Sequence, residues 1–161
     1  MIKAFQIRVP GSTANLGPGF DSIGAALNLY LNLHVTTQDH WEFIHIGPNT
    51  PVDTTVEHHL IYKYATEVAQ SFNKQLTPCK VEMTSELPLA RGLGSSASAI
   101  VAGIQLADSL CNLQLTRDEK VHLASCEEGH PDNAGASVTG GLVVGMHEAE
   151  QTALMSFPLA N

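Results

Sequence analysis

The sequence predicts an α+β fold, a mixed sheet with helices packed on one side. Segments with the two-residue periodicity of strands occur near both ends of the chain, and segments with helical periodicity lie between them. The predicted order of strands, helix, strand, two helices and strands is typical of this class. At 161 residues, 43% of them apolar, the chain is long enough to bury one hydrophobic core.

Three strands are predicted in the first third of the chain. Residues 2–9 alternate apolar and polar side chains, and residues 26–37 do so more regularly, with leucine or valine at every second position. Residues 41–46 are predicted to be the hairpin partner of that second strand. The segment 10–19 is rich in glycine, proline, serine and asparagine, which predicts a loop.

Helices and further strands are predicted in the rest of the chain. Apolar residues at helical spacing predict helices at residues 57–72 and 95–112. Thr116 followed by Glu119 is a capping box, which predicts a helix near residues 117–127. Further strands are predicted at residues 79–84, 138–146 and 152–157, and a polar loop at residues 128–133.

The overall composition narrows the classes of function that are compatible with the sequence. A net charge of −8 argues against a nucleic-acid partner, which needs a basic face. Cys79, Cys111 and Cys126 have the spacing of neither a disulfide framework nor a metal site. We expect these cysteines to be small buried residues of a protein in a reducing compartment. No apolar run approaches membrane-spanning length and the first residues lack the apolar core of a signal peptide, so a soluble cytoplasmic protein without a membrane partner is expected.

The stretch ELPLARGLGSSASAIV (residues 86–101) joins a predicted strand to a predicted helix through a glycine-rich turn. Such a turn binds phosphate well, because free amides and the helix dipole favour an anion there. Gly92 and Gly94 would admit the ligand, and Arg91 would add a charged donor. The alternative is an ordinary helix start capped by Ser95 or Ser96, and spacing alone leaves both interpretations open.

Two other loops carry polar residues that favour a shared site. PGSTANLGPGFD (residues 10–21) follows a predicted strand and contains Asn15 and Asp21. EGHPDN (residues 128–133) places two acids, a histidine and an asparagine within six positions. Each could be a surface turn by itself, since Asn and Asp are common turn residues. Three such loops in one small domain predict that they meet at one site.

Together these motifs resemble the GHMP kinase superfamily and, within it, the homoserine kinase family. PLARGLGSSASA is similar to the superfamily's glycine-rich signature, and PGSTANLGPGFDSIGAAL and EGHPDNAGASVTGGL resemble homoserine kinase motifs. The resemblance implies transfer of a phosphoryl group from ATP, with Mg²⁺, to the side-chain hydroxyl of L-homoserine, a step of threonine biosynthesis. Relatives are often dimers, so a homodimer is a further expectation.

The resemblance also assigns roles residue by residue. Ser96 matches the serine whose hydroxyl binds Mg²⁺ in the family. Asp21, His130 and Asn133 match catalytic positions, with Asp21 ahead of His130 as a candidate base. The substrate-binding positions are Asn15, Asp21, His130, Asp132 and Asn133. The ATP-binding positions are Pro88, Leu89, Ala90, Arg91, Gly92, Leu93, Gly94, Ser95, Ser96, Ala97 and Ser98.

The chain departs from the family pattern in three places. First, His122 stands where relatives have a metal-binding glutamate, so Glu127 and Glu128 are the alternatives for that ligand. Second, Thr139 stands where relatives have an aromatic residue. Relatives continue into a C-terminal domain with substrate-binding arginines. Residues 1–161 are therefore interpreted as the N-terminal, ATP-binding domain, and an alternative assigns the residues after about 150 to the start of a truncated C-terminal domain.

Two alternative functions stay open, and so do two interpretations of the residues at the start of the first helix. The chain could be another small-molecule GHMP kinase, although GHPDN favours an amino-alcohol substrate, or an ATP-binding domain without catalysis. His58 and His59 are interpreted as a surface pair at a helix N-terminus. The resemblance keeps His59 and Leu60 as candidates for the adenine site.

Overall fold

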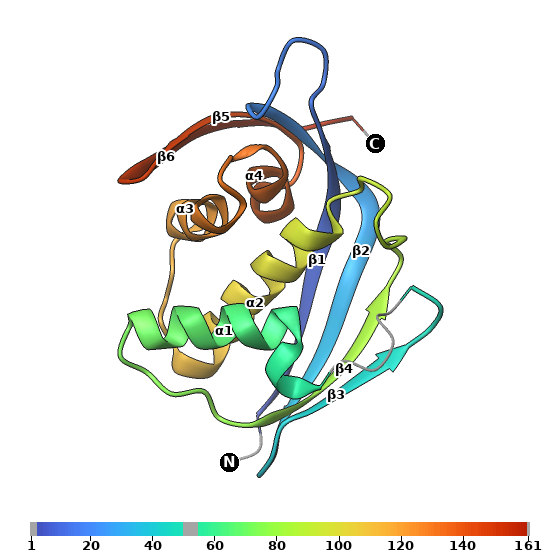
Figure 1. Ribbon diagram of the computed structural model, residues 1–161, viewed down its shortest axis with the longest axis vertical. Helices are drawn as coiled ribbons and strands as arrows, with labels where there is room; N and C mark the ends of the chain where they lie inside the picture. Colours follow the sequence, from blue (N-terminus) through green and yellow to red (C-terminus); the bar gives the residue numbers. More distant parts are fainter. Residues whose placement is uncertain (1–2, 50–54, 161) are drawn as a thin grey trace.

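The computed structural model describes residues 3–49 and 55–160, which form a six-stranded sheet and four α-helices. The elements are β1 (Ala4–Ala14), β2 (Ile23–Thr37), β3 (Glu42–Ile46), a 3₁₀ turn η1 (Val56–His58), α1 (Leu60–Ser71), β4 (Cys79–Ser85), α2 (Ser95–Cys111), α3 (Arg117–Glu128), α4 (Asp132–Thr139), β5 (Leu142–Glu148) and β6 (Gln151–Phe157). Figure 1 shows the helices on one side of the curved sheet, which confirms the predicted fold class.

The long strand β2 is the centre of the sheet. One of its edges pairs along its length with β1, in antiparallel register. Its other edge is divided: Leu31–Thr37 pair with β4, whereas Ile23–Ala25 pair with β5. The alternation noted in the sequence is confirmed, because Leu31, Leu33 and Val35 are buried in the core. β6 pairs with β5, and Figure 1 shows this hairpin bending over α3 and α4.

The predicted hairpin between residues 41–46 and β2 is wrong. β3 forms at this place, but it pairs in parallel with β4, with Glu42 opposite Lys80 and Ile46 opposite Thr84. β4 itself occupies the edge of β2 that a hairpin would have used. Parallel neighbours need a crossover connection, and α1 lies in the chain segment that joins them.

Two other boundaries differ from the sequence-based expectation. β1 continues to Ala14 through part of the predicted loop, with a register shift between Pro10 and Ser12. The segment after Pro131 is helix α4, so the predicted loop ends earlier and the predicted strand at 138–146 begins only at Leu142. Helix α4 packs against β1 and β2. Small residues allow that close packing, since a Cβ at Gly24 would lie 2.3 Å from the Asp132 carbonyl oxygen.

The helices supply most of the core that faces the sheet. α2 buries much of its surface, including Ile100, Val101 and Ile104. α3 begins with the predicted capping box, since Thr116 Oγ1 accepts from the Glu119 amide at 3.2 Å and the Glu119 carboxylate accepts from the Thr116 amide at 2.7 Å. Across residues 3–49 and 55–160, no helix combines the length and apolar character needed to cross a membrane.

His59 connects the start of α1 to the sheet and is buried, so the expected exposed pair with His58 is wrong. Its Nε2 lies 2.9 Å from His45 Nε2 on β3, and its ring stacks on Phe43 with centroids 4.0 Å apart. Burial, and secondarily the nearby charge of His45, lower the pKa of His59 from 6.5 to about 4. The imidazole is therefore neutral at physiological pH.

We expect the free energy of unfolding to decrease as the pH falls from 6.5 to about 4. The unfolded chain takes up a proton at His59 across this window while the folded chain does not. The stabilising contribution is fully present above pH 6.5 and is lost toward pH 4, by on the order of 3 kcal/mol. Urea unfolding at stepped pH measures it.

His59→Gln should remove this component of the pH dependence. The matched control is His40→Gln, since His40 is exposed beside Asp39 and its replacement should leave the component in place. An identical pH profile in wild type and His59→Gln would contradict the assignment.

Candidate active site

A cavity of about 380 Å³ lies beside the N-terminus of α2. Its walls combine apolar side chains from the sheet and α1 with three serine residues from the first turn of α2. The lining residues include Leu31, His59, Ile61, Met83, Leu87, Ser95, Ser96 and Ser98. The cavity therefore has an apolar body and one polar end, where the helix begins.

The glycine-rich loop ends in a helix start that no side chain of residues 3–49 or 55–160 caps. Gly94 is the N-cap residue in the left-handed conformation, with φ of +69°, and no side-chain cap bond is made there. The alternative in which Ser95 or Ser96 caps the helix is therefore wrong. Ser98 Oγ donates instead to the Ser95 carbonyl at 2.9 Å. First-turn amides without a side-chain acceptor are suited to an anion.

The glycine-rich loop packs directly on β1. A Cβ atom built at Gly94 would lie 2.2 Å from Ser12 Oγ and 2.9 Å from the Ser12 amide nitrogen. The Ser12 amide in turn donates to the Leu93 carbonyl at 3.1 Å. Gly94 is thus required twice, by its positive φ and by this approach. Gly92 also has a positive φ, but a Cβ there would meet no atom within 4 Å among the residues described.

Ser12 joins three separate parts of the chain. Its buried hydroxyl donates to Asn133 Oδ1 at 2.8 Å, and Ser137 Oγ donates to it at 3.4 Å. These bonds connect β1 to α4, while the Leu93 contact connects β1 to the glycine-rich loop. Sequence reasoning did not select Ser12, although it lies within the PGSTANLGPGFD motif.

The two other polar loops meet as expected. One ligand atom each from Asp21, His130 and Asp132 lies within 4.8 Å of the other two. Asn15 Oδ1 accepts from the Asp21 amide at 3.2 Å, and both residues have positive φ, so the loop after β1 is held in a tight turn. Figure 1 shows this loop, the start of α2 and α4 toward the same end of the sheet.

Asp132 occupies an interior position. Its carboxylate is 1% exposed, lies 2.6 Å from His130 Nδ1, and accepts from the Asn133 amide at 2.6 Å. His130 is partly exposed. In this geometry His130 can donate from Nδ1 to Asp132 and present Nε2 to a ligand. Asp132 therefore acts on the site through His130.

The glutamate alternatives for a metal ligand differ in environment. Glu128 Oε1 is buried and makes no hydrogen bond to any residue that the structure describes. Glu127 is exposed. A buried carboxylate oxygen without a donor is costly unless a cation or another group compensates it. The donor set of the Glu128 carboxylate and the exposed Ser96 hydroxyl fits a hard cation such as Mg²⁺.

Comparison with known proteins points to homoserine kinases. The chain is 55% identical over 148 residues to the homoserine kinase of Bacillus velezensis, covering 92% of this chain and 48% of that protein. It is 49% identical over 158 residues to the enzyme of Shouchella clausii, covering 98% of this chain and 52% of that protein. The chain thus spans about half the length of the curated relatives it matches.

Solved structures show the same fold. A Listeria monocytogenes protein assigned as a homoserine kinase matches with a TM-score of 0.85 and 44% identity, over 97% of this chain and 54% of that chain. The mevalonate diphosphate decarboxylase of Staphylococcus aureus matches with a TM-score of 0.68, 22% identity and coverage of 97% and 50%, which shows the fold alone. The family model of the GHMP kinases N terminal domain matches residues 59–141, more than half of the chain and including the glycine-rich loop. The chain therefore belongs to the GHMP kinase N-terminal domain family.

Proposed function

We propose that the protein containing this chain transfers the γ-phosphoryl group of ATP to the side-chain hydroxyl of L-homoserine, giving O-phospho-L-homoserine and ADP. The observation that carries the proposal is the convergence on Ser12 of the glycine-rich loop and the Asn133 end of α4. This brings an anion-binding helix start next to a group of carboxylate, imidazole and amide side chains. Homoserine kinases that are 55% and 49% identical to this chain over the aligned half of their length support the choice of acceptor.

ATP would lie with its adenosine part in the cavity and its phosphates at the start of α2. The apolar walls suit a nucleobase, and His59 and Leu60 both line them. First-turn amides and the helix dipole favour an anion by roughly 0.3–1 kcal/mol. This local attraction acts against the overall charge of −8. Gly92, with open space at its Cβ position, leaves room for the phosphates.

Homoserine would lie between the loop after β1 and the start of α4. The Asp21 carboxylate would pair with the substrate ammonium group, and His130, oriented by Asp132, would hold the hydroxyl for in-line attack. Asn133 keeps its Nδ2 donors for the substrate because Ser12 occupies its oxygen. The hydroxyl proton leaves to Asp21, to His130 or to solvent, since a largely dissociative transfer does not need a strong base.

Mg²⁺ would be held by Ser96 and Glu128. The buried, unpartnered Oε1 of Glu128 is the supporting observation, within the part of the chain that the structure describes. When bound, the ion neutralises phosphate charge as it builds up during transfer. Ser96 and Glu128 come from α2 and α3, so packing of these two helices sets the site.

A coupled assay of ADP release tests the proposal on the purified protein that carries this chain in its native reading frame. We expect turnover with L-homoserine and none with mevalonate. Turnover of mevalonate alone would overturn the choice of acceptor. ATP binding, followed in parallel by titration with Mg²⁺ present, identifies a binding domain if it occurs without any turnover.

Ser12→Ala should lower kcat/KM for homoserine by about 10- to 100-fold, because Asn133 Oδ1 loses its donor in a partly buried position. The matched control is Ser137→Ala, which removes only the longer 3.4 Å contact to Ser12 and should cost much less. Equal losses in the two variants would contradict the role given to Ser12. Steady-state kinetics and circular dichroism of both variants provide the measurement.

Asp21→Asn should raise the KM for homoserine and lower kcat/KM by about 10- to 100-fold, because an amide cannot neutralise the substrate ammonium. The dissociation constant of ATP should stay unchanged. Asp39→Asn, at an exposed acid beside His40, is the control and should leave both constants unchanged. A loss of ATP affinity with an unchanged homoserine KM would place Asp21 elsewhere in the mechanism.

A further inference from the structure

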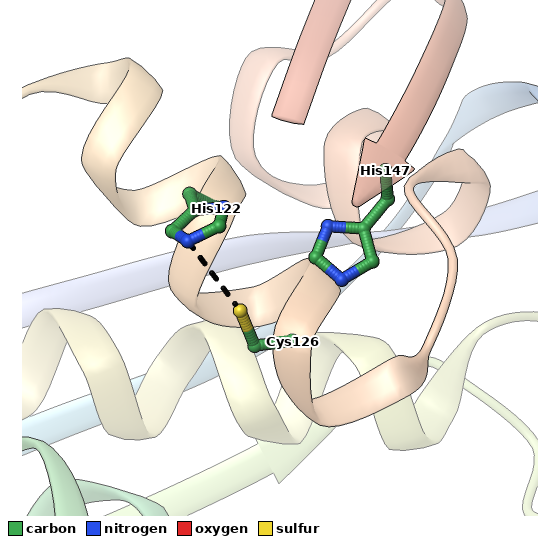
Figure 2. A group of neighbouring side chains, drawn as sticks. All are labelled: His122, Cys126 and His147. Carbon is green, nitrogen blue, oxygen red and sulfur yellow. Dashed lines mark hydrogen bonds between the residues drawn. The ribbon is translucent and has the colours of Figure 1, made fainter. Parts of the chain in front are cut away.

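Two histidines and a cysteine form a second cluster, on the side of α3 that faces the β5–β6 hairpin. Figure 2 shows His122 and Cys126 projecting from α3 and His147 from β5 toward one point. His122 and Cys126 are four residues apart, so they lie on the same face of the helix. The sequence showed no metal spacing for the cysteines, because His147 comes from a distant strand. Cys126 is exposed, so its expected burial is wrong.

The spacing of the three side chains matches a tetrahedral metal site. One ligand atom of each residue lies within 4.8 Å of the other two. Cys126 Sγ is 3.6 Å from His122 Nε2. With Zn–S of about 2.3 Å and Zn–N of about 2.0–2.1 Å, two tetrahedral ligands are separated by about 3.6 Å. The α3 pair therefore already has the required separation, and the His147 side chain would move to close the site.

Thr152 on β6 orients both imidazoles. Its Oγ1 lies 2.9 Å from His122 Nδ1 and 2.7 Å from His147 Nδ1. A hydroxyl oxygen can accept from both rings, and in the tautomer with the protons on Nδ1 both Nε2 lone pairs are left for a metal. Such an outer hydrogen bond on the second ring nitrogen is the usual support of a metal-bound histidine.

The chemical state of the groups is compatible with metal binding. Partial burial, with smaller contributions from His122 and His130, lowers the pKa of His147. A thiol that coordinates a metal ion loses its proton, so Cys126 would bind as the thiolate. Both histidines are partly exposed, which gives an ion access from solvent.

We propose that His122, Cys126 and His147 bind one Zn²⁺ ion through two imidazole nitrogens and one thiolate, with water in the fourth position. The ion would tie α3 to β5, and Thr152 would hold the ligands from β6. The donor set of nitrogen and sulfur favours zinc over magnesium, which prefers oxygen. The site is independent of the proposed kinase reaction, and its ligands are none of the side chains assigned to ATP or homoserine.

Cobalt(II) is the probe that tests the site, added to the reduced, metal-free chain. We expect one ion per chain, a thiolate-to-cobalt charge-transfer band in the near ultraviolet, tetrahedral visible bands, and displacement by Zn²⁺ but not by Mg²⁺. Zn²⁺ should also raise the thermal unfolding midpoint, because it binds only the folded state. Cys126→Ser should abolish the charge-transfer band. His147→Gln should abolish the binding of one cobalt ion per chain and, with it, the tetrahedral visible bands.

Matched variants separate this site from other ligands. Cys111→Ser and His40→Gln, which change residues outside the cluster, should bind cobalt as wild type does. Thr152→Val should weaken binding by about 10- to 100-fold while keeping the charge-transfer band. Circular dichroism of each metal-free variant verifies that it is folded.

Three results would overturn the proposal. One is the absence of cobalt binding, and another is a charge-transfer band that persists in Cys126→Ser. The third is binding that is insensitive to the cluster variants but lost in His130→Gln, which would place the ion at the Asp21, His130 and Asp132 group.

Discussion

The contact between Gly94 and Ser12 is the constraint on which the candidate active site depends. Backbone lies against backbone here, and a single methyl group at residue 94 would collide with the Ser12 hydroxyl. Because Ser12 also bonds to Leu93 and Asn133, it fixes the glycine-rich loop and α4 relative to each other. The start of α2 and the polar cluster around His130 therefore keep a fixed separation, as the proposed in-line transfer would require.

Burial divides the polar residues of this region into two kinds. Ser12 and Asp132 are fully enclosed and satisfied, and they position other groups. Asp21, His130 and Ser96 keep access to solvent and are available to ligands. Glu128 fits neither group, because one of its carboxylate oxygens is buried but has no hydrogen-bond partner among the described residues. The proposed Mg²⁺ ion would compensate the cost of this buried oxygen.

Local patterns in the sequence predicted most of the periodic elements and the glycine-rich turn, but not helix α4, which begins inside a predicted loop and takes the start of a predicted strand. The alternation of β2, the Thr116–Glu119 capping box and the glycine-rich turn each depend on nearby residues, and the structure confirms them. Long-range pairing was not predictable in this way. The partner of β3 is decided by competition for the edge of β2, and no feature of residues 41–46 encodes that outcome. Likewise, the role of Ser12 follows from contacts with residues far along the chain, and the cluster at Cys126 needs His147 from another element.

The divided edge of β2 has a consequence for the order of assembly during synthesis. Ile23–Ala25 lie at the same end of β2 as the loop that carries Asp21, yet their partner β5 begins only at Leu142. During synthesis the backbone groups on one edge of this part of β2 stay unpaired until the segments that form α1, α2, α3 and α4 have left the ribosome. The end of the sheet that carries the candidate site is therefore completed only after all four helices have been synthesised.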